Sequence, residues 1–295
     1  MDNNENLINP LTQYIQPPYD EKKQEVPGYE TFMNIKPDHG ENSYVGSGKL
    51  KGRKAIITGG DSGIGRAVAI AFAREGADIV ISYLDEHADA KETADYIEKE
   101  GQKAILLPGD ISKEENCISI VNQAVEQIGG IDIIVNNAAY QMSRDSLQDI
   151  SAEEWETTFR VNIHPMFYIC KAAEKYLEPG STIINTTSVN AYKAPAHLIP
   201  YSATKAAIQN FTVSLAQLWA DKGIRVNCVA PGPIWTPLIP ATLKAEKVEQ
   251  FGSDTPLKRA GQPAELAPAY VLLASQDSSY MTGSTVQVTG GYPTI

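Results

Sequence analysis

The sequence has only three cysteines, no excess of basic residues and no long apolar run. Cys117, Cys170 and Cys228 lie far apart without a C-x-x-C pair, so they predict buried thiols in a reducing compartment, not a disulfide framework or a zinc site. Lysine and arginine number 25 against 36 acidic residues, and the net charge of -11 argues against binding to nucleic acid or to an anionic membrane. No run approaches the roughly 20 apolar residues of a membrane helix. Residues 1–9 also lack the basic and apolar parts of a secretory signal, so we expect a soluble, cytoplasmic globular protein.

The composition changes near residue 50. Residues 1–50 contain five prolines and no sustained strand or helix period, so we expect an extended N-terminal arm that cannot bury a face by itself. From residue 51 to 295, apolar strand-like runs alternate with helical patterns, which indicates βαβ units around a parallel sheet. The predicted strands are 55–58, 78–83, 104–107, 131–135, 182–185, 225–229 and 285–288. This pattern predicts an α/β fold: a single doubly wound Rossmann-type domain with a seven-stranded parallel sheet flanked by helices.

Local signals mark the ends of several predicted helices. The helix after the first strand carries its apolar residues on one face and is expected to stop at Gly76. Ser112 with Glu115, and Ser151 with Glu154, have the spacing of capping boxes and predict two helix starts. Another helix is expected to begin near Tyr201.

A glycine-rich turn, Thr58-Gly59-Gly60-Asp61-Ser62-Gly63-Ile64-Gly65, joins the first predicted strand to the first helix. Glycines there let the backbone approach a pyrophosphate, which then lies at the positive end of the helix. Glycines also serve ordinary turns. The position between a buried strand and a helix is therefore what predicts a dinucleotide site.

This glycine spacing resembles that of the short-chain dehydrogenase/reductase family, T-G-x-x-x-G-I-G, and further motifs follow in the family's order over about residues 54–291. They are Asn136-Asn137-Ala138-Ala139 in place of N-N-A-G, then Asn162, Ser188, the Y-x-x-x-K pair Tyr201 and Lys205, and Pro231-Gly232 with Thr236. Alanine at position 139 departs from the family pattern. The glycine turn, residues 231–240 and parts of the arm look like the glucose/ribitol dehydrogenase-like branch.

The resemblance implies hydride transfer between a nicotinamide cofactor and an alcohol or carbonyl compound. Tyr201 would act as general acid or base, Lys205 would hold the nicotinamide ribose, Ser188 would orient the substrate oxygen, and Asn162 would support a proton-relaying water. Tyr201 and Lys205 are four residues apart, so they share a helix face. Since free tyrosine has a pKa of about 10, we expect the ammonium and an oxidised nicotinamide to lower the pKa of Tyr201 toward neutrality. The alternative is a non-catalytic dinucleotide sensor or scaffold, although such proteins typically lose the Tyr or Lys.

The expected cofactor contacts come from the turns at the carboxyl ends of the strands. They are Gly59, Asp61, Ser62, Gly63, Ile64, Gly65, Tyr83, Asp85, Asp110, Ile111, Asn136, Ala138, Tyr201, Lys205, Pro231, Gly232, Ile234 and Thr236.

The choice between NAD and NADP depends on the end of the second strand. NAD-selective relatives carry an acid there, whereas this chain has Tyr83, with Asp85 and Glu86 close behind it and Asp61 in the glycine turn. These carboxylates would repel a 2′-phosphate, and Arg66, the nearby cation, falls inside a helix. We therefore expect NAD, with NADP as the alternative.

The remaining expectations concern substrate, metal and assembly. The family resemblance implies a lid at about 234–258, with Trp235 bordering the substrate, and the branch resemblance suggests a sugar or polyol. His164 and His197 have no carboxylate or cysteine partners nearby in sequence, so no metal site is expected. Family members are commonly tetramers, so we expect a homotetramer whose subunit contacts include the arm. Its anchors would be Tyr14, Tyr19, Tyr29 and Phe32, and the alternative is a tail that is disordered in the monomer.

Overall fold

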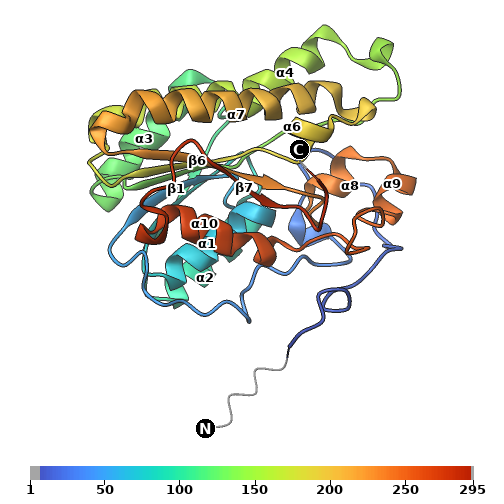
Figure 1. The fold of residues 1–295 in the computed structure, drawn as a ribbon, viewed down its shortest axis with the longest axis horizontal. Helices are drawn as coiled ribbons and strands as arrows, with labels where there is room; N and C mark the ends of the chain where they lie inside the picture. The colour runs from blue at the N-terminus through green and yellow to red at the C-terminus, as the bar shows by residue number, and fades with distance from the viewer. Residues whose placement is uncertain (1–6, 294–295) are drawn as a thin grey trace.

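A parallel sheet with strand order β3-β2-β1-β4-β5-β6-β7 forms the centre of the molecule (Figure 1). The structure, a computed structural model, describes residues 7–293, so the first six residues of the predicted arm and the last two of the predicted domain lie outside it. The strands are β1 (Lys54–Thr58), β2 (Asp78–Tyr83), β3 (Ala104–Pro108), β4 (Ile133–Asn136), β5 (Thr182–Thr186), β6 (Arg225–Pro231) and β7 (Thr285–Val288). All seven predicted strands are confirmed, and the order reverses between β1 and β4, as in a doubly wound fold.

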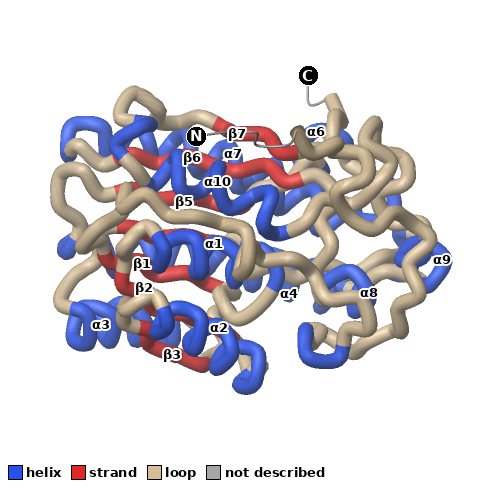
Figure 2. Tube along the Cα trace, turned by 90° about the horizontal axis from the view of Figure 1, so that it is seen from below, coloured by secondary structure: helices blue, strands red, loops and turns tan. Residues whose placement is uncertain are grey.

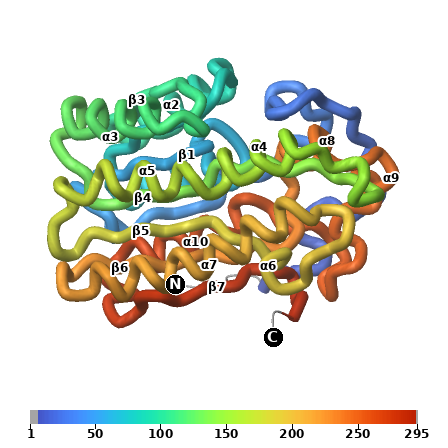
Figure 3. Tube along the Cα trace, turned by 90° about the horizontal axis from the view of Figure 1, so that it is seen from above, coloured from blue at the N-terminus to red at the C-terminus, as the bar shows by residue number. Residues whose placement is uncertain are grey.

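Helices cover both faces of the sheet. On one face lie α1 (Gly63–Arg74), α2 (His87–Lys99) and α10 (Pro263–Ala274); on the other lie α3 (Glu114–Ile128), α4 (Ala152–Asn162), α5 (His164–Ala173) and α7 (Ile199–Trp219) (Figures 1 and 3). The short helices α6 (Asn190–Lys193), α8 (Leu238–Thr242) and α9 (Ala245–Glu249) lie among loops beyond one end of the strands (Figure 2). Single 3₁₀ turns occur at Glu30–Phe32, Leu147–Asp149, Glu174–Tyr176, Ala196–Leu198, Ala220–Lys222 and Gln276–Ser278.

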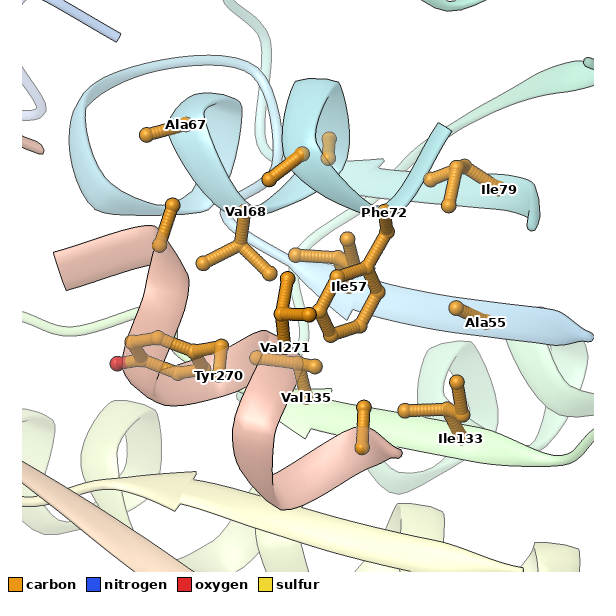
Figure 4. Packing of buried hydrophobic residues seen from close by; sticks show 14 of the residues in the cluster. Ala55, Ile57, Ala67, Val68, Phe72, Ile79, Ile133, Val135, Tyr270 and Val271 are labelled. Carbon is orange, nitrogen blue, oxygen red and sulfur yellow. The ribbon is translucent and has the colours of Figure 1, made fainter. Parts of the chain in front are cut away.

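The core has two main layers because the strands are buried on both faces. Phe72 and Val68 of α1 pack with Tyr270 and Val271 of α10 above β1 and β4 (Figure 4). Alternate residues of β1, such as Ile56, join the opposite layer beneath α3, α5 and α7. Near-continuous apolar strands are typical of such doubly covered parallel sheets, which is why the strands could be read from sequence.

Neither of the two predicted capping boxes is complete in the part of the chain that the structure describes. The helix after β3 begins at Glu114 with Lys113 as its N-cap, and no side chain caps it. Ser112 instead donates its backbone N–H to the carboxylate of Asp110 at 2.9 Å, so a turn precedes the helix. The start at Ser151 is confirmed, since its hydroxyl accepts from the Glu154 N–H at 3.1 Å.

The N-terminal arm folds back on its own chain. Tyr19 is 3% exposed and stacks on Trp235 with ring centroids 4.3 Å apart, while Phe32 is 68% exposed. Tyr14 lies with its ring 5.1 Å from the Arg259 guanidinium, and Tyr29 donates to Asp85. Tyr19 is therefore an anchor within one chain, which corrects the expectation that it packs against a neighbouring subunit. The packing of residues 7–50 on the domain disfavours the alternative, a tail that is disordered in the monomer.

Between residues 7 and 293, none of the helices combines the length and the apolar character that a membrane span requires.

Candidate active site

A cavity of about 630 Å³ opens at the carboxyl ends of the strands. It brings together most of the residues expected to bind cofactor or to act in catalysis: Gly59, Asp61, Ser62, Gly63, Ile64, Tyr83, Asp110, Ile111, Ala138, Ser188, Tyr201, Lys205, Pro231, Gly232, Ile234 and Thr236. Four expected residues, Gly65, Asp85, Asn136 and Asn162, do not line it.

The two outer glycines of the glycine turn are required for different reasons, backbone conformation at Gly59 and lack of space at Gly65. Gly59 has a positive φ of 63°, and a Cβ on Gly65 would lie 1.8 Å from the carbonyl oxygen of Gly59. Gly65 therefore packs the start of α1 against the turn instead of facing the cavity. Ser62 is the N-cap of α1 and makes no side-chain capping bond.

Asn137, which the sequence analysis did not assign to the cofactor site, holds this turn against β4. Its side chain donates to the carbonyl oxygens of Gly59 at 3.2 Å and Thr58 at 3.3 Å. Asn136, predicted as a cofactor contact, is buried between strands and donates to the Asn185 side chain at 2.8 Å. In a strand, neighbouring side chains point to opposite faces, so the second asparagine, not the first, reaches the cavity.

Tyr201, Lys205 and Ser188 form the polar floor of the cavity. Tyr201 and Lys205 lie one turn apart on α7, and Ser188 follows β5. The Lys205 ammonium donates to the carbonyl oxygen of Thr186 at 2.8 Å and lies 5.2 Å from the centre of the Tyr201 ring. The Ser188 hydroxyl oxygen accepts the Asn190 N–H at 3.1 Å, which leaves its hydrogen for another acceptor.

Burial controls the protonation of this group. Burial raises the pKa of Tyr201 to about 12, although interaction with Ser188 opposes the rise. Burial also lowers the pKa of Lys205 to about 7. Burial is thus the largest influence on the pKa of Tyr201, and the structure shows no lowering of that pKa by the Lys205 amine. A protonated phenol is suited to donate a proton to a developing alkoxide.

Asn162 lies at the last position of α4 and joins two parts of the site. Its amide N–H groups donate to the carbonyl oxygen of Tyr140 at 2.9 Å and to the Thr204 hydroxyl at 3.0 Å. Its oxygen accepts the Tyr140 N–H at 2.7 Å. Both donors are engaged by the chain itself, so the geometry is that of a brace between the loop after β4 and α7.

Two buried carboxylates line the cavity, Asp61 from the glycine turn and Glu86 from the segment after β2, and Tyr83 at the end of β2 lines it too. Burial, followed by the charge of Glu86, raises the pKa of Asp61 to about 7. Asp85, the predicted acid, does not line the cavity; its carboxylate accepts from the Tyr29 hydroxyl instead. The sequence thus predicted an acidic segment after β2, but the carboxylate of this segment that lines the cavity belongs to Glu86 and not to Asp85.

No basic side chain from β2 or the segment after it lines the cavity within residues 7–293. Arg66 is 3% exposed and donates to Glu30 at 2.7 Å and to Glu92 at 3.0 Å. The lysines that line the cavity are Lys193, Lys205 and Lys247, which come from α6, α7 and α9. A cation suited to a 2′-phosphate is thus missing from this part of the site.

The lid and the arm complete the walls. Leu238, Ile239, Leu243 and Phe251 contribute apolar surface from the predicted lid, whereas Trp235 is fully buried and does not line the cavity. Trp235 instead donates its indole N–H to the carbonyl oxygen of Ile35 at 2.9 Å, which corrects its expected place beside the substrate. Residues 26–28 of the arm also line the cavity, a contribution without any sequence signal.

Within the described part of the chain, no group of three or more histidine, cysteine or acidic side chains is placed to hold a metal ion.

Several known proteins similar to this chain are named as oxidoreductases. Uncharacterized oxidoreductase YhdF of Bacillus subtilis (strain 168) is 57% identical over 284 residues, 96% of this chain and 98% of the relative. Glucose and ribitol dehydrogenase of Daucus carota is 47% identical over 277 residues, covering 92% of this chain and 95% of the relative. NADPH-dependent aldehyde reductase 1, chloroplastic, of Arabidopsis thaliana is 47% identical over 278 residues, covering 92% and 96%.

Solved structures give the same assignment. A short-chain dehydrogenase from Burkholderia cenocepacia J2315 in complex with NADP superposes with a TM-score of 0.77 at 30% identity, covering 82% of this chain and 98% of that one. The family model described as enoyl-(acyl carrier protein) reductase matches residues 59–293. These similarities, with the fold and the nucleotide-type cavity, show that the chain belongs to the short-chain dehydrogenase/reductase family of oxidoreductases, which use a nicotinamide cofactor.

Proposed function

We propose that this protein transfers a hydride between NAD(H) and an alcohol or carbonyl compound, with Tyr201 as the general acid or base. The observation that carries the proposal is the convergence of Tyr201, Lys205 and Ser188 on the cavity that the glycine turn also lines. This cavity runs from the end of β2 to α7, so its residues fit an extended dinucleotide. When bound, the nicotinamide supplies the hydride.

In the reducing direction, the chain's own groups handle the oxygen and the proton. The Ser188 hydroxyl donates to the substrate carbonyl oxygen and orients it, since its own oxygen is fixed by Asn190. Tyr201 donates its phenolic proton to the same oxygen as negative charge develops there. Lys205, held by Thr186, stabilises the phenolate that remains.

The preference for NAD over NADP is supported by two buried carboxylates that line the cavity, Asp61 of the glycine turn and Glu86, which follows β2. A 2′-phosphate placed there would meet like charges without a free cation, whereas ribose hydroxyls could donate to the carboxylates. The Burkholderia neighbour was solved with NADP, and the Arabidopsis relative is named for NADPH. A preference for NAD would therefore distinguish this chain from both proteins.

Fluorescence titrations with NADH and NADPH test the cofactor without any guess about the substrate. We expect the Kd for NADH to be at least tenfold lower than that for NADPH, a difference of about 1.4 kcal/mol. Equal or tighter NADPH binding would reject the role of Asp61 and Glu86. Binding of neither would reject the enzyme proposal as a whole.

A panel of aldehydes, sugars and polyols, including glucose and ribitol, then tests the reaction through absorbance of the reduced cofactor. Turnover that disappears in Tyr201→Phe supports the proposed chemistry. Tight cofactor binding without turnover of any carbonyl or alcohol in the panel would favour the alternative, a dinucleotide-binding sensor.

We also propose that the protein is a cytoplasmic homotetramer. Apolar side chains on α4, α5 and α7 are exposed, namely Trp155, Phe167, Val213 and Leu218, and this surface is suited to a subunit contact. The three cysteines are buried and free, as is usual in a reducing compartment. Sedimentation of the purified chain as a monomer would reject the assembly.

A further inference from the structure

The N-terminal arm forms part of the wall of the cofactor cavity. Residues 26–28 line it beside the glycine turn and the lid. Gly28 has a positive φ of 91°, and a Cβ there would lie 2.6 Å from the carbonyl oxygen of Pro237. The backbone of the arm thus lies directly against the start of α8.

Glu30 connects the arm to the glycine turn. It is 3% exposed, and its carboxylate accepts the Gly63 N–H at 3.0 Å and a guanidinium N–H of Arg66 at 2.7 Å. Gly63 is the first residue of α1, whose N-cap Ser62 provides no side-chain bond, so a carboxylate 33 positions earlier in the chain satisfies this amide. Burial alone would raise the pKa of Glu30, but hydrogen bonding and charge from His39, then Arg66, hold it below its ordinary range.

The backbone of Glu30 is fixed as firmly as its side chain. Asp89 of α2 accepts the N–H of Glu30 at 2.7 Å and that of Thr31 at 3.1 Å. The carboxylate of Glu30 is therefore held in one position between α1 and α2.

The segments of the arm on either side of Glu30 are bound to the lid. The indole of Trp235 donates to Ile35, and the Lys23 ammonium donates to the carbonyl oxygens of Ala241 at 2.7 Å and Leu243 at 3.2 Å. The arm thus contacts both the glycine turn and the lid, two segments that line the same cavity.

We propose that Glu30 is a positioning residue of the cofactor site. By holding Gly63 and Arg66, its carboxylate sets the first turn of α1 so that the following free N–H groups face the cofactor diphosphate. This inference rests on the proposed use of a nicotinamide dinucleotide.

The test compares NADH affinity in Glu30→Ala, Glu30→Gln and the control Glu21→Gln. Glu21 is also an arm carboxylate that accepts backbone N–H groups, those of Asn34 at 3.1 Å and Ile35 at 3.0 Å, but it does not touch the glycine turn. We expect Glu30→Ala to raise the Kd for NADH on the order of tenfold, as loss of one charge-assisted hydrogen bond would. Glu30→Gln keeps an acceptor for Gly63 and should restore most of the affinity. Glu21→Gln should leave the Kd unchanged.

Kinetics and melting temperature separate positioning from a loss of structure. At saturating cofactor, kcat of Glu30→Ala should equal that of the wild type while the KM for NADH rises. An unchanged Kd in Glu30→Ala, or an equal rise in Glu21→Gln with an equal fall in melting temperature, would overturn the inference.

If Glu30→Ala does not fold, Glu30→Asp replaces it, because the shorter carboxylate keeps the charge but not the reach to Gly63. Wild-type affinity in that variant would overturn the inference. Failure of the wild type to bind NADH or NADPH would instead reject the proposed function itself.

Discussion

The ammonium nitrogen of Lys205 lies 5.2 Å from the centre of the Tyr201 ring, and on the same face of α7 the Lys205 side chain is buried while that of Tyr201 is partly buried. Burial favours the neutral form of both groups. It raises the pKa of Tyr201 to about 12 and lowers the pKa of Lys205 to about 7. A bound cationic nicotinamide would favour the phenolate by direct attraction. With its phenol protonated, Tyr201 is suited to donate a proton.

Tyr201→Phe should lower kcat by at least about 10²-fold, because it removes the only hydroxyl proposed to donate the proton. The Kd for NADH should change little, since the ring that packs in α7 is retained. Tyr192→Phe is the matched control, as Tyr192 is exposed on α6 and does not line the cavity. Steady-state turnover and NADH titration measure the two effects, and full activity of Tyr201→Phe would contradict the mechanism.

Lys205→Met should change the pH dependence of stability. The folded pKa of about 7 lies below the ordinary value of 10.5, so the unfolded chain binds more protons between these values and wild-type stability rises with pH there. The melting temperature of Lys205→Met should therefore be higher than that of the wild type. The difference should be largest at about pH 6 and should become small toward about pH 10. Melting curves over this range check the trend. Lys51→Met, at an exposed lysine, should show a constant difference from the wild type.

Asp61→Asn should stabilise the protein only when Asp61 would be ionised. The folded pKa of about 7 lies above the ordinary value of 3.8, so the wild type loses stability as the pH rises from about 4 through 7. The melting temperature of Asp61→Asn should therefore exceed that of the wild type by a margin that grows from about pH 4 to pH 7 and stays constant above about pH 8. A gap independent of pH would show that Asp61 does not titrate in this way.

The same substitution should alter cofactor choice. Removing the carboxylate lowers the repulsion of a 2′-phosphate, so the ratio of the NADPH Kd to the NADH Kd should fall several-fold at pH 8. Asp85→Asn is the control, because Asp85 lies outside the cavity. If Asp85→Asn moved the ratio and Asp61→Asn did not, the assignment from the structure would be reversed.

Tyr19→Ala should destabilise the protein by about 3–5 kcal/mol, since it removes a buried aromatic ring that stacks on Trp235. Phe32→Ala, in the same arm but 68% exposed, should change the free energy of unfolding by no more than about 0.5 kcal/mol. Denaturant unfolding of both variants measures this difference. Comparable effects would mean that the arm does not pack on its own chain in solution.

The sheet and the Tyr201–Lys205 pair were predictable because each has a local signal. Buried parallel strands leave continuous apolar runs, and a spacing of four places two side chains on one helical face. Which of Asn136 and Asn137, and which of Asp85 and Glu86, faces the cavity depends on the direction of side chains at and just after a strand end. A shift of one position in the predicted strand end reverses that direction, so the sequence alone did not decide it. Glu30 had no signal at all, since its partners Gly63, Arg66 and Asp89 are brought to it only by the folded domain.

The bonds from Lys23 to Ala241 and from Trp235 to Ile35 span 218 and 200 positions of the chain. During synthesis, Glu30 can meet Arg66 as soon as α1 leaves the ribosome, whereas Tyr19, Lys23 and Ile35 must wait for the lid to be translated. Until then, the apolar surface of Tyr19 and Met33 has no partner and is open to wrong contacts. The arm therefore cannot complete its contacts with the lid until the chain has been made as far as Leu243.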